Sequence, residues 1–84
     1  MVSASAERDI DRLPDRSSDA VRKFVKGPLR NNPRRAGTQL AGDRSTMFEA
    51  LGPGWRVLYQ IDANTTSVKV MVVAPRREGD ARPE

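Results

Sequence analysis

The stretch GPGWRVLYQID, residues 52–62, predicts a core β-strand that begins after a tight turn. Side chains alternate between the two faces of a strand, and one face here holds aromatic and β-branched residues, which strands favour. These residues are Trp55, Val57, Tyr59 and Ile61. The other face carries Arg56 and Gln60, so two long polar groups lie on a strand whose opposite face is suited to a core.

Further strands are predicted on both sides of this one. TMFEAL, residues 46–51, precedes the GPG turn, and VKVMVVA, residues 68–74, follows the turn-forming DANTTS and ends at Pro75. Strict alternation along the last strand sets Val68, Val70 and Val72 on one face and Lys69, Met71 and Val73 on the other. Strands joined by such short turns pair in antiparallel order, so we expect a three-stranded meander.

Two helices are predicted before the strands. SASAERDIDRLP, residues 3–14, offers Ser3 or Ser5 as an N-cap, and PDRSSDAVRKFVKGPL, residues 14–29, forms the second helix. Apolar side chains recur at helical spacing in both segments, at Ala6, Ile10, Leu13, Ala20, Val21, Phe24 and Val25. Residues 30–45 are rich in Asn, Pro, Gly and Arg, which is typical of a loop.

The fold class that follows is α+β, with an N-terminal helical hairpin packed on a small antiparallel β-sheet meander. A chain of 84 residues supports one small core, so we expect a single domain over residues 1–84. Residues 76–84 lack an apolar anchor, and we expect them to form a flexible tail.

The composition excludes several classes of chemistry. The chain has no cysteine and no histidine, so thiol nucleophiles, disulfides, Cys/His zinc sites and histidine acid–base catalysis are ruled out, and we expect no metal or cofactor. No apolar run is long enough to cross a membrane and no signal peptide is apparent, which favours a cytoplasmic location. The net charge is +4, and twelve of the fifteen basic residues are arginine. That excess favours phosphate recognition, although a coding bias towards arginine would also produce it.

Three arginines are expected to converge at one edge of the sheet. Arg56 projects from the polar face of its strand, and the end of the last strand brings Arg76 and Arg77 to the same neighbourhood. Each also has an ordinary explanation. The aliphatic stem of Arg56 would cover an apolar neighbour such as Met71, and charges commonly follow strand ends.

A separate group of cations lies between Arg22 and Arg35, a run without any acidic residue. It comprises Arg22, Lys23, Lys26, Arg30, Arg34 and Arg35. Such a cluster is suited to phosphate contacts on RNA, with Lys26, Arg30, Arg34 and Arg35 as the candidate RNA-binding residues. A solvated helix face and loop is an equally good explanation for any one of them.

Four segments, in this order and spacing, resemble the RelE/ParE superfamily of toxins from bacterial type II toxin–antitoxin systems, on the RelE side. They are AERDIDRLP, GPLRNNPRRAGTQLAG, GWRVLYQID and VKVMVVAPRRE, and together they span nearly the whole chain. GPLRNNPRRAGTQLAG resembles the helix end and loop that lead to the family's Leu-x-Gly. GWRVLYQID is similar to its Gly-aromatic-Arg-Val-x-Tyr-x-Ile-Asp strand.

The resemblance implies a compact α+β toxin that cleaves messenger RNA in the ribosomal A site, where the message's own 2'-hydroxyl attacks the adjacent phosphate. Arg56 matches the strand arginine of the family, and Arg76 matches the arginine after the last strand, with Arg77 as the alternative if the register shifts by one. The implied partners are the ribosome, its mRNA and a cognate antitoxin, whose acidic helical or extended segment would neutralise these arginines.

Three features depart from the family pattern. The strand before the GPG turn lacks the usual basic residues and carries Glu49, and an acid beside a transferring phosphate is unfavourable. Pro75 stands where a Lys or His commonly precedes the last arginine, and no aromatic residue follows Tyr59. The family's opening strand has room only for its last residues, so we expect either that this strand is truncated or that the true start lies upstream. Without this strand the sheet exposes an edge.

Two main alternatives remain open from the sequence. The chain is either a ribosome-dependent endoribonuclease that relies on its arginines, or a decayed, non-catalytic member that binds antitoxin or RNA but cuts poorly. A gyrase inhibitor of the ParE type is a third and weaker alternative, because GPLRNNPRRAGTQLAG and GWRVLYQID favour the RelE side.

Overall fold

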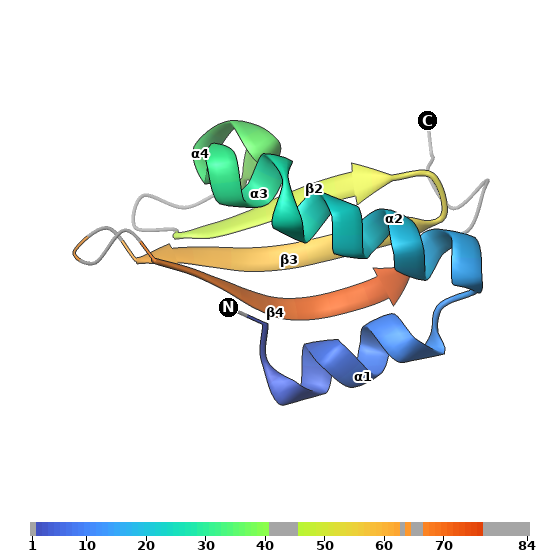
Figure 1. Ribbon diagram of the computed structural model, residues 1–84. Coiled ribbons are helices and arrows are strands. Elements are labelled where there is room, and N and C mark those ends of the chain that lie inside the picture. The colour runs from blue at the N-terminus through green and yellow to red at the C-terminus, as the bar shows by residue number, and fades with distance from the viewer. Residues whose placement is uncertain (1, 41–45, 63, 65–66, 77–84) are drawn as a thin grey trace.

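The computed structural model describes residues 2–40, 46–62, 64 and 67–76. It contains the elements α1 (Ala4–Arg12), α2 (Asp15–Lys26), α3 (Pro28–Asn31), α4 (Pro33–Ala36), β1 (Thr38–Gln39), β2 (Met47–Gly52), β3 (Trp55–Asp62) and β4 (Ser67–Pro75). The strands form one antiparallel sheet in the order β1-β2-β3-β4. The helices lie on one face of this sheet, so the domain has two layers (Figure 1). The predicted α+β class is confirmed.

The two long helices begin and end where the sequence predicts. Ser3 is the N-cap of α1, and its hydroxyl accepts a hydrogen bond from the backbone N–H of Ala6 at 3.1 Å. The helix α2 begins after Pro14 and ends at Lys26, with Gly27 as its C-cap. Arg22 of α2 forms ion pairs with Asp11 at 2.7 Å and Glu7 at 3.6 Å, both on α1. These ion pairs link the two helices of the hairpin that covers the sheet. No described helix is long and apolar enough to span a membrane.

Residues 30–45 were predicted as a loop, and the structure corrects this for the part that it describes. Residues 30–40 contain the end of α3, all of α4 and the strand β1, whereas residues 41–45 lie outside the described residues. Both short helices start with proline, which is tolerated in a first helical turn. The strand β1 adds a fourth strand to the expected three. It has only two residues, both exposed, so it gives no alternating hydrophobic signal.

A β-bulge corrects the predicted alternation along β4. Tyr59 pairs with Val70 but Leu58 pairs with Val72, so Met71 is the extra residue in the ladder. The side-chain pattern therefore shifts by one position after the bulge. Val73 is buried at 3% exposure while Val72 is 40% exposed, the reverse of strict alternation.

The outer edge of β4 is covered by the start of the chain and by α1. Val2 forms an isolated parallel bridge with Val70, and the N–H of Ser3 donates to the Val70 carbonyl at 3.2 Å. Further along, the Asp9 carboxylate accepts from the N–H of Val73 at 3.4 Å. Within the described residues, the expected opening strand is represented by this single bridge.

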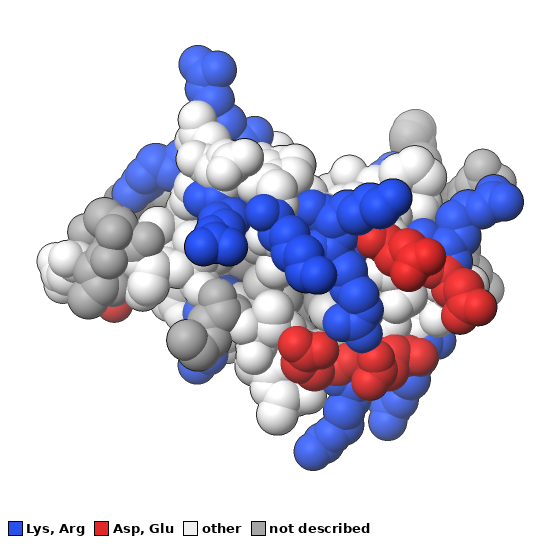
Figure 2. Space-filling model, in the orientation of Figure 1, with Lys and Arg blue, Asp and Glu red and all other residues white. Residues whose placement is uncertain are grey.

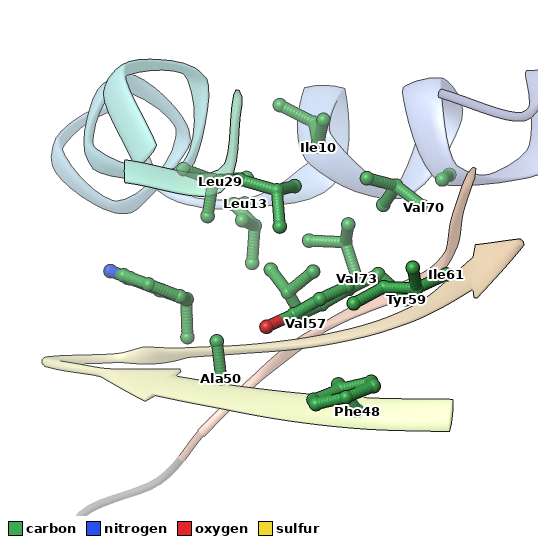
Figure 3. Close-up of a cluster of buried hydrophobic side chains, with 13 residues drawn as sticks. Ile10, Leu13, Leu29, Phe48, Ala50, Val57, Tyr59, Ile61, Val70 and Val73 are labelled. Atoms are coloured by element: carbon green, nitrogen blue, oxygen red, sulfur yellow. The ribbon is translucent and has the colours of Figure 1, made fainter. Parts of the chain in front are cut away.

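The core lies between the helices and the sheet (Figure 3). Its buried members are Ala6, Ile10, Leu13, Val21, Leu29, Phe48, Ala50, Trp55, Val57, Tyr59, Ile61, Val70 and Val73. Phe48 and Tyr59 stack with ring centroids 5.5 Å apart. The Tyr59 hydroxyl donates to the Pro33 carbonyl at 2.7 Å, which fixes the start of α4 against the sheet.

Candidate active site

The candidate site lies on the face of the sheet that no described helix covers. Along β3, burial alternates so that Trp55, Val57, Tyr59 and Ile61 face the helices. The intervening side chains, Arg56 among them, project from the opposite face. We call this the open face. On β2, the same alternation buries Phe48 and Ala50 and leaves Glu49 on the open face.

Arg56 forms an ion pair with Glu49 on the open face. Its Nε lies 2.6 Å from Glu49 Oε2, and the exposed fractions of the two side chains are 46% and 26%. Arg56 is paired with Leu51 across the hairpin and Glu49 with Leu58, so the two charged residues are diagonal cross-strand neighbours. Among the described residues, only Glu49 accepts a hydrogen bond from the Arg56 guanidinium, and it does so from Nε. The two terminal nitrogens of the guanidinium therefore have no described partner and can bind another anion.

The surroundings of this ion pair are largely apolar. Arg56 is flanked by Leu51 on β2 and Ala74 on β4, and Leu58, the next open-face residue on β3, is paired with Val72. Leu51 is 51% exposed and Val72 is 40% exposed. The Arg56 side chain is itself 46% exposed, so it is accessible to an incoming anion, while solvent screens part of its charge.

Arg76 lies at the same end of the sheet as Arg56. It follows β4 by one residue, and its backbone N–H donates to the Gly54 carbonyl in the turn before β3 at 3.1 Å. Ala74, two residues earlier, is the direct cross-strand partner of Arg56. The structure therefore brings these two predicted site residues to one region. Arg77 lies outside the described residues.

The predicted RNA-binding residues lie elsewhere. Lys26 ends α2, Arg30 belongs to α3, and Arg34 and Arg35 belong to α4, and all four are at least partly exposed. Figure 2 shows basic side chains gathered over α2, α3 and α4 on the helix side of the molecule. Arg56 projects from the opposite face of the sheet, so the chain has two separate basic regions. We call the four helix-side cations the helical basic patch.

The proton-transfer groups of the site are few. Tyr59 is the only tyrosine, but it points into the core, and burial raises the pKa of its hydroxyl. It is therefore neither on the open face nor readily ionised.

Sequence reasoning counted Glu49 only as an unfavourable acid and missed its direct contact with Arg56. The sequence held a signal for this contact. A two-residue turn pairs Gly52 with Trp55, and counting residues back along both strands from that pair places Glu49 diagonally across from Arg56.

These features define a small α+β domain with an arginine site on an open sheet face and a basic patch on its helices. No protein-family model matches the sequence. The chain is, however, 39% identical to the toxin RelE of Mycobacterium tuberculosis over 75 residues, covering 89% of this chain and 77% of that protein. It is 34% identical to the toxin RelG of the same organism, covering 90% of this chain and 87% of that protein.

Solved structures agree with this relationship. The toxin–antitoxin complex RelBE2 of M. tuberculosis contains a chain that matches with a TM-score of 0.81 and 34% identity, covering 90% of this chain and 94% of that one. The isolated E. coli RelE toxin shares the fold, with a TM-score of 0.74 and 18% identity over 94% of this chain and 84% of that one. The chain belongs to the RelE family of toxins.

Proposed function

We propose that this chain is a ribosome-dependent endoribonuclease that acts in the cytoplasm, cleaving mRNA in the ribosomal A site and so inhibiting translation. The observation that carries the proposal is the placement of Arg56, in a member of the RelE family. Its guanidinium is fixed by Glu49 through Nε, no described residue bonds to its two terminal nitrogens, and its direct cross-strand neighbours are the apolar Leu51 and Ala74.

The chemistry requires little of the protein beyond orientation and charge. The 2'-oxygen of the message attacks the adjacent phosphorus, the bond to the 5'-oxygen breaks, and a cyclic phosphate remains. Extra negative charge develops on the phosphate oxygens during attack. A guanidinium held in advance stabilises that charge without reorganisation. Arg56 takes this role, and Arg76 or Arg77 supplies a second cation from the end of β4.

The helical basic patch provides the affinity for the ribosome. Lys26, Arg30, Arg34 and Arg35 are solvent-accessible cations on the side of the molecule opposite to Arg56. Contacts to backbone phosphates supply binding without sequence preference, as a toxin that acts on many messages requires. In this arrangement one side of the domain holds ribosomal RNA while the other faces the message.

A cognate antitoxin is the expected protein partner. The solved relative RelBE2 is a toxin–antitoxin complex, and an acidic, helical antitoxin suits the positive net charge of this chain. Carboxylates of such a partner would pair with Arg56 and Arg76 and prevent phosphate from binding.

The alternative is that the chain is a non-catalytic member of the family. The observation that favours it is the ion pair with Glu49, which already occupies one edge of the Arg56 guanidinium. Expression of the chain from a tightly controlled promoter in a bacterium, with Arg56→Ala alongside, separates the two. Mapping message 5' ends after induction should show new cuts in frame with codons that are lost in the variant. Absence of new cuts from a soluble, folded protein would favour the non-catalytic function.

A further inference from the structure

The proposed reaction needs a group that accepts the proton of the attacking 2'-hydroxyl. The chain has no histidine or cysteine, and guanidinium groups stay protonated at neutral pH. Tyr59 is turned into the core with its hydroxyl bound to Pro33. The described carboxylates on the open face are Glu49 and Asp62. Asp62 is at the far end of β3, where it accepts from the N–H of Asn64 at 2.9 Å. Of these described groups, Glu49 is therefore the acceptor placed beside Arg56.

The geometry of the pair places a base beside a phosphate-binding group. Glu49 uses Oε2 to accept from Arg56 Nε, and no described residue donates a hydrogen bond to its Oε1. The guanidinium is planar and rigid, so an anion bound by its terminal nitrogens is held at a fixed position relative to Glu49. In RNA the 2'-hydroxyl is attached to the carbon next to the one that bears the phosphate. A phosphate on Arg56 thus brings its own nucleophile within reach of Oε1.

We propose that Glu49 is the general base of the cleavage reaction. This rests on the proposed function. The Glu49 carboxylate takes the proton of the 2'-hydroxyl as the 2'-oxygen forms its bond to phosphorus. The bond between phosphorus and the 5'-oxygen then breaks, and that oxygen takes a proton from water. Glu49 returns its proton to solvent, so no oxidant, reductant or metal enters the balance.

The competing role for Glu49 is that of an internal inhibitor. Its negative charge would then merely occupy Arg56 and repel the incoming phosphate. The two roles predict opposite effects of removing the charge: loss of the base slows cleavage, whereas loss of an inhibitor accelerates it. Glu49→Gln separates them, because glutamine keeps the size and a hydrogen-bond acceptor for Arg56 Nε but cannot take up a proton at neutral pH.

The test uses the purified full chain and ribosomes programmed with a defined message, with the cleavage rate measured at saturating toxin. We expect Glu49→Gln to be slower than the parent chain by about 100-fold or more, the usual contribution of a general base. Asp62→Asn is the matched control, because it removes the other described open-face carboxylate, and it should cleave at the parent rate. Ribosome binding should be equal in all three, because Glu49 does not belong to the helical basic patch.

Chemical rescue distinguishes a base from a merely structural residue. Glu49→Ala should be as slow as Glu49→Gln, and added sodium formate should restore part of its rate while sodium chloride at the same ionic strength does not. Glu49→Gln, whose side chain fills the space, should show no rescue. Cleavage by Glu49→Gln at or above the parent rate would overturn the assignment and show the internal inhibitor instead. Failure of the parent chain itself to cleave would overturn the proposed function.

Discussion

Arg56 Nε lies 2.6 Å from Glu49 Oε2, across the hairpin of β2 and β3 and on the face of the sheet opposite the helices. This contact changes how both residues act. Arg56 is held in place before any anion arrives, and within the part of the chain that the structure describes its terminal nitrogens are available to that anion. Glu49 in turn becomes part of the site and is not simply an acid left on a strand. The pair is the structural basis of the predictions on RNA cleavage.

Arg56→Ala is expected to remove activity without unfolding the chain. The ion pair is partly exposed, and such pairs contribute at most about 1 kcal/mol to stability. Thermal unfolding followed by circular dichroism should therefore show a cooperative transition close to that of the parent. Loss of the folded state in Arg56→Ala would contradict this expectation and show that the pair stabilises the sheet.

Reversing the charge of Arg34 and Arg35 to glutamate is expected to weaken binding to ribosomes. These two cations of α4 belong to the helical basic patch. A plot of log affinity against log salt concentration has a negative slope, and each lost phosphate contact makes this slope less steep by about one. Sedimentation with ribosomes over a series of salt concentrations measures both effects.

The control for this pair is a double reversal of Arg12 and Arg16, two exposed arginines outside the patch. It changes the net charge by the same amount. An equal loss of affinity in both double variants would mean that overall charge, and not the helical basic patch, determines ribosome binding.

The β-bulge gives a matched pair of stability predictions. Val73 is 3% exposed and Val72 is 40% exposed, although strict alternation predicts the reverse. Val73→Ala removes buried methyl groups and should lower the free energy of unfolding by roughly 2 kcal/mol, whereas Val72→Ala should cost about 0.5 kcal/mol or less. Urea denaturation of both variants measures the difference. A larger cost at Val72 would place the bulge elsewhere.

The buried tyrosine predicts a dependence on alkaline pH. Burial raises the pKa of Tyr59 above its ordinary value of 10.0, so the folded chain holds the phenolic proton more tightly than the unfolded chain. The stability from neutral Tyr59 is fully present below pH 10.0 and is lost as the pH rises through the raised pKa. Because the chain has one tyrosine, absorbance at alkaline pH reports its ionisation directly. A midpoint at or below that of the urea-unfolded chain would contradict this burial.

Most of the fold was predictable from the sequence because its strongest signals are local. The Ser3 cap, the apolar periodicity of α1 and α2 and the alternation from Trp55 to Ile61 each follow from neighbouring residues. The short helices α3 and α4, the strand β1 and the β-bulge were missed. The strand β1 is defined by pairing with β2 and not by its own two exposed residues, and the bulge at Met71 is defined by the register with β3.

The candidate site was predictable only in part. The family resemblance indicated Arg56 and Arg76, and the structure brings both to one end of the sheet. The separation of the helical basic patch from Arg56 depends on which face of the sheet the helices cover, and four cations in a sequence do not specify that. The contact with Glu49 depends on the hairpin register, and treating each charged residue alone overlooked it.

Cleavage of a defined message on purified ribosomes, by the parent chain and by Arg56→Ala, tests the role of the open-face arginine most directly. We predict a single set of cuts within the A-site codon for the parent chain, with cyclic phosphate ends, and no cuts for the folded variant. We also predict no cuts where the nucleotide before the scissile bond carries a 2'-deoxyribose. Undiminished cleavage by folded Arg56→Ala would contradict the assignment of this site.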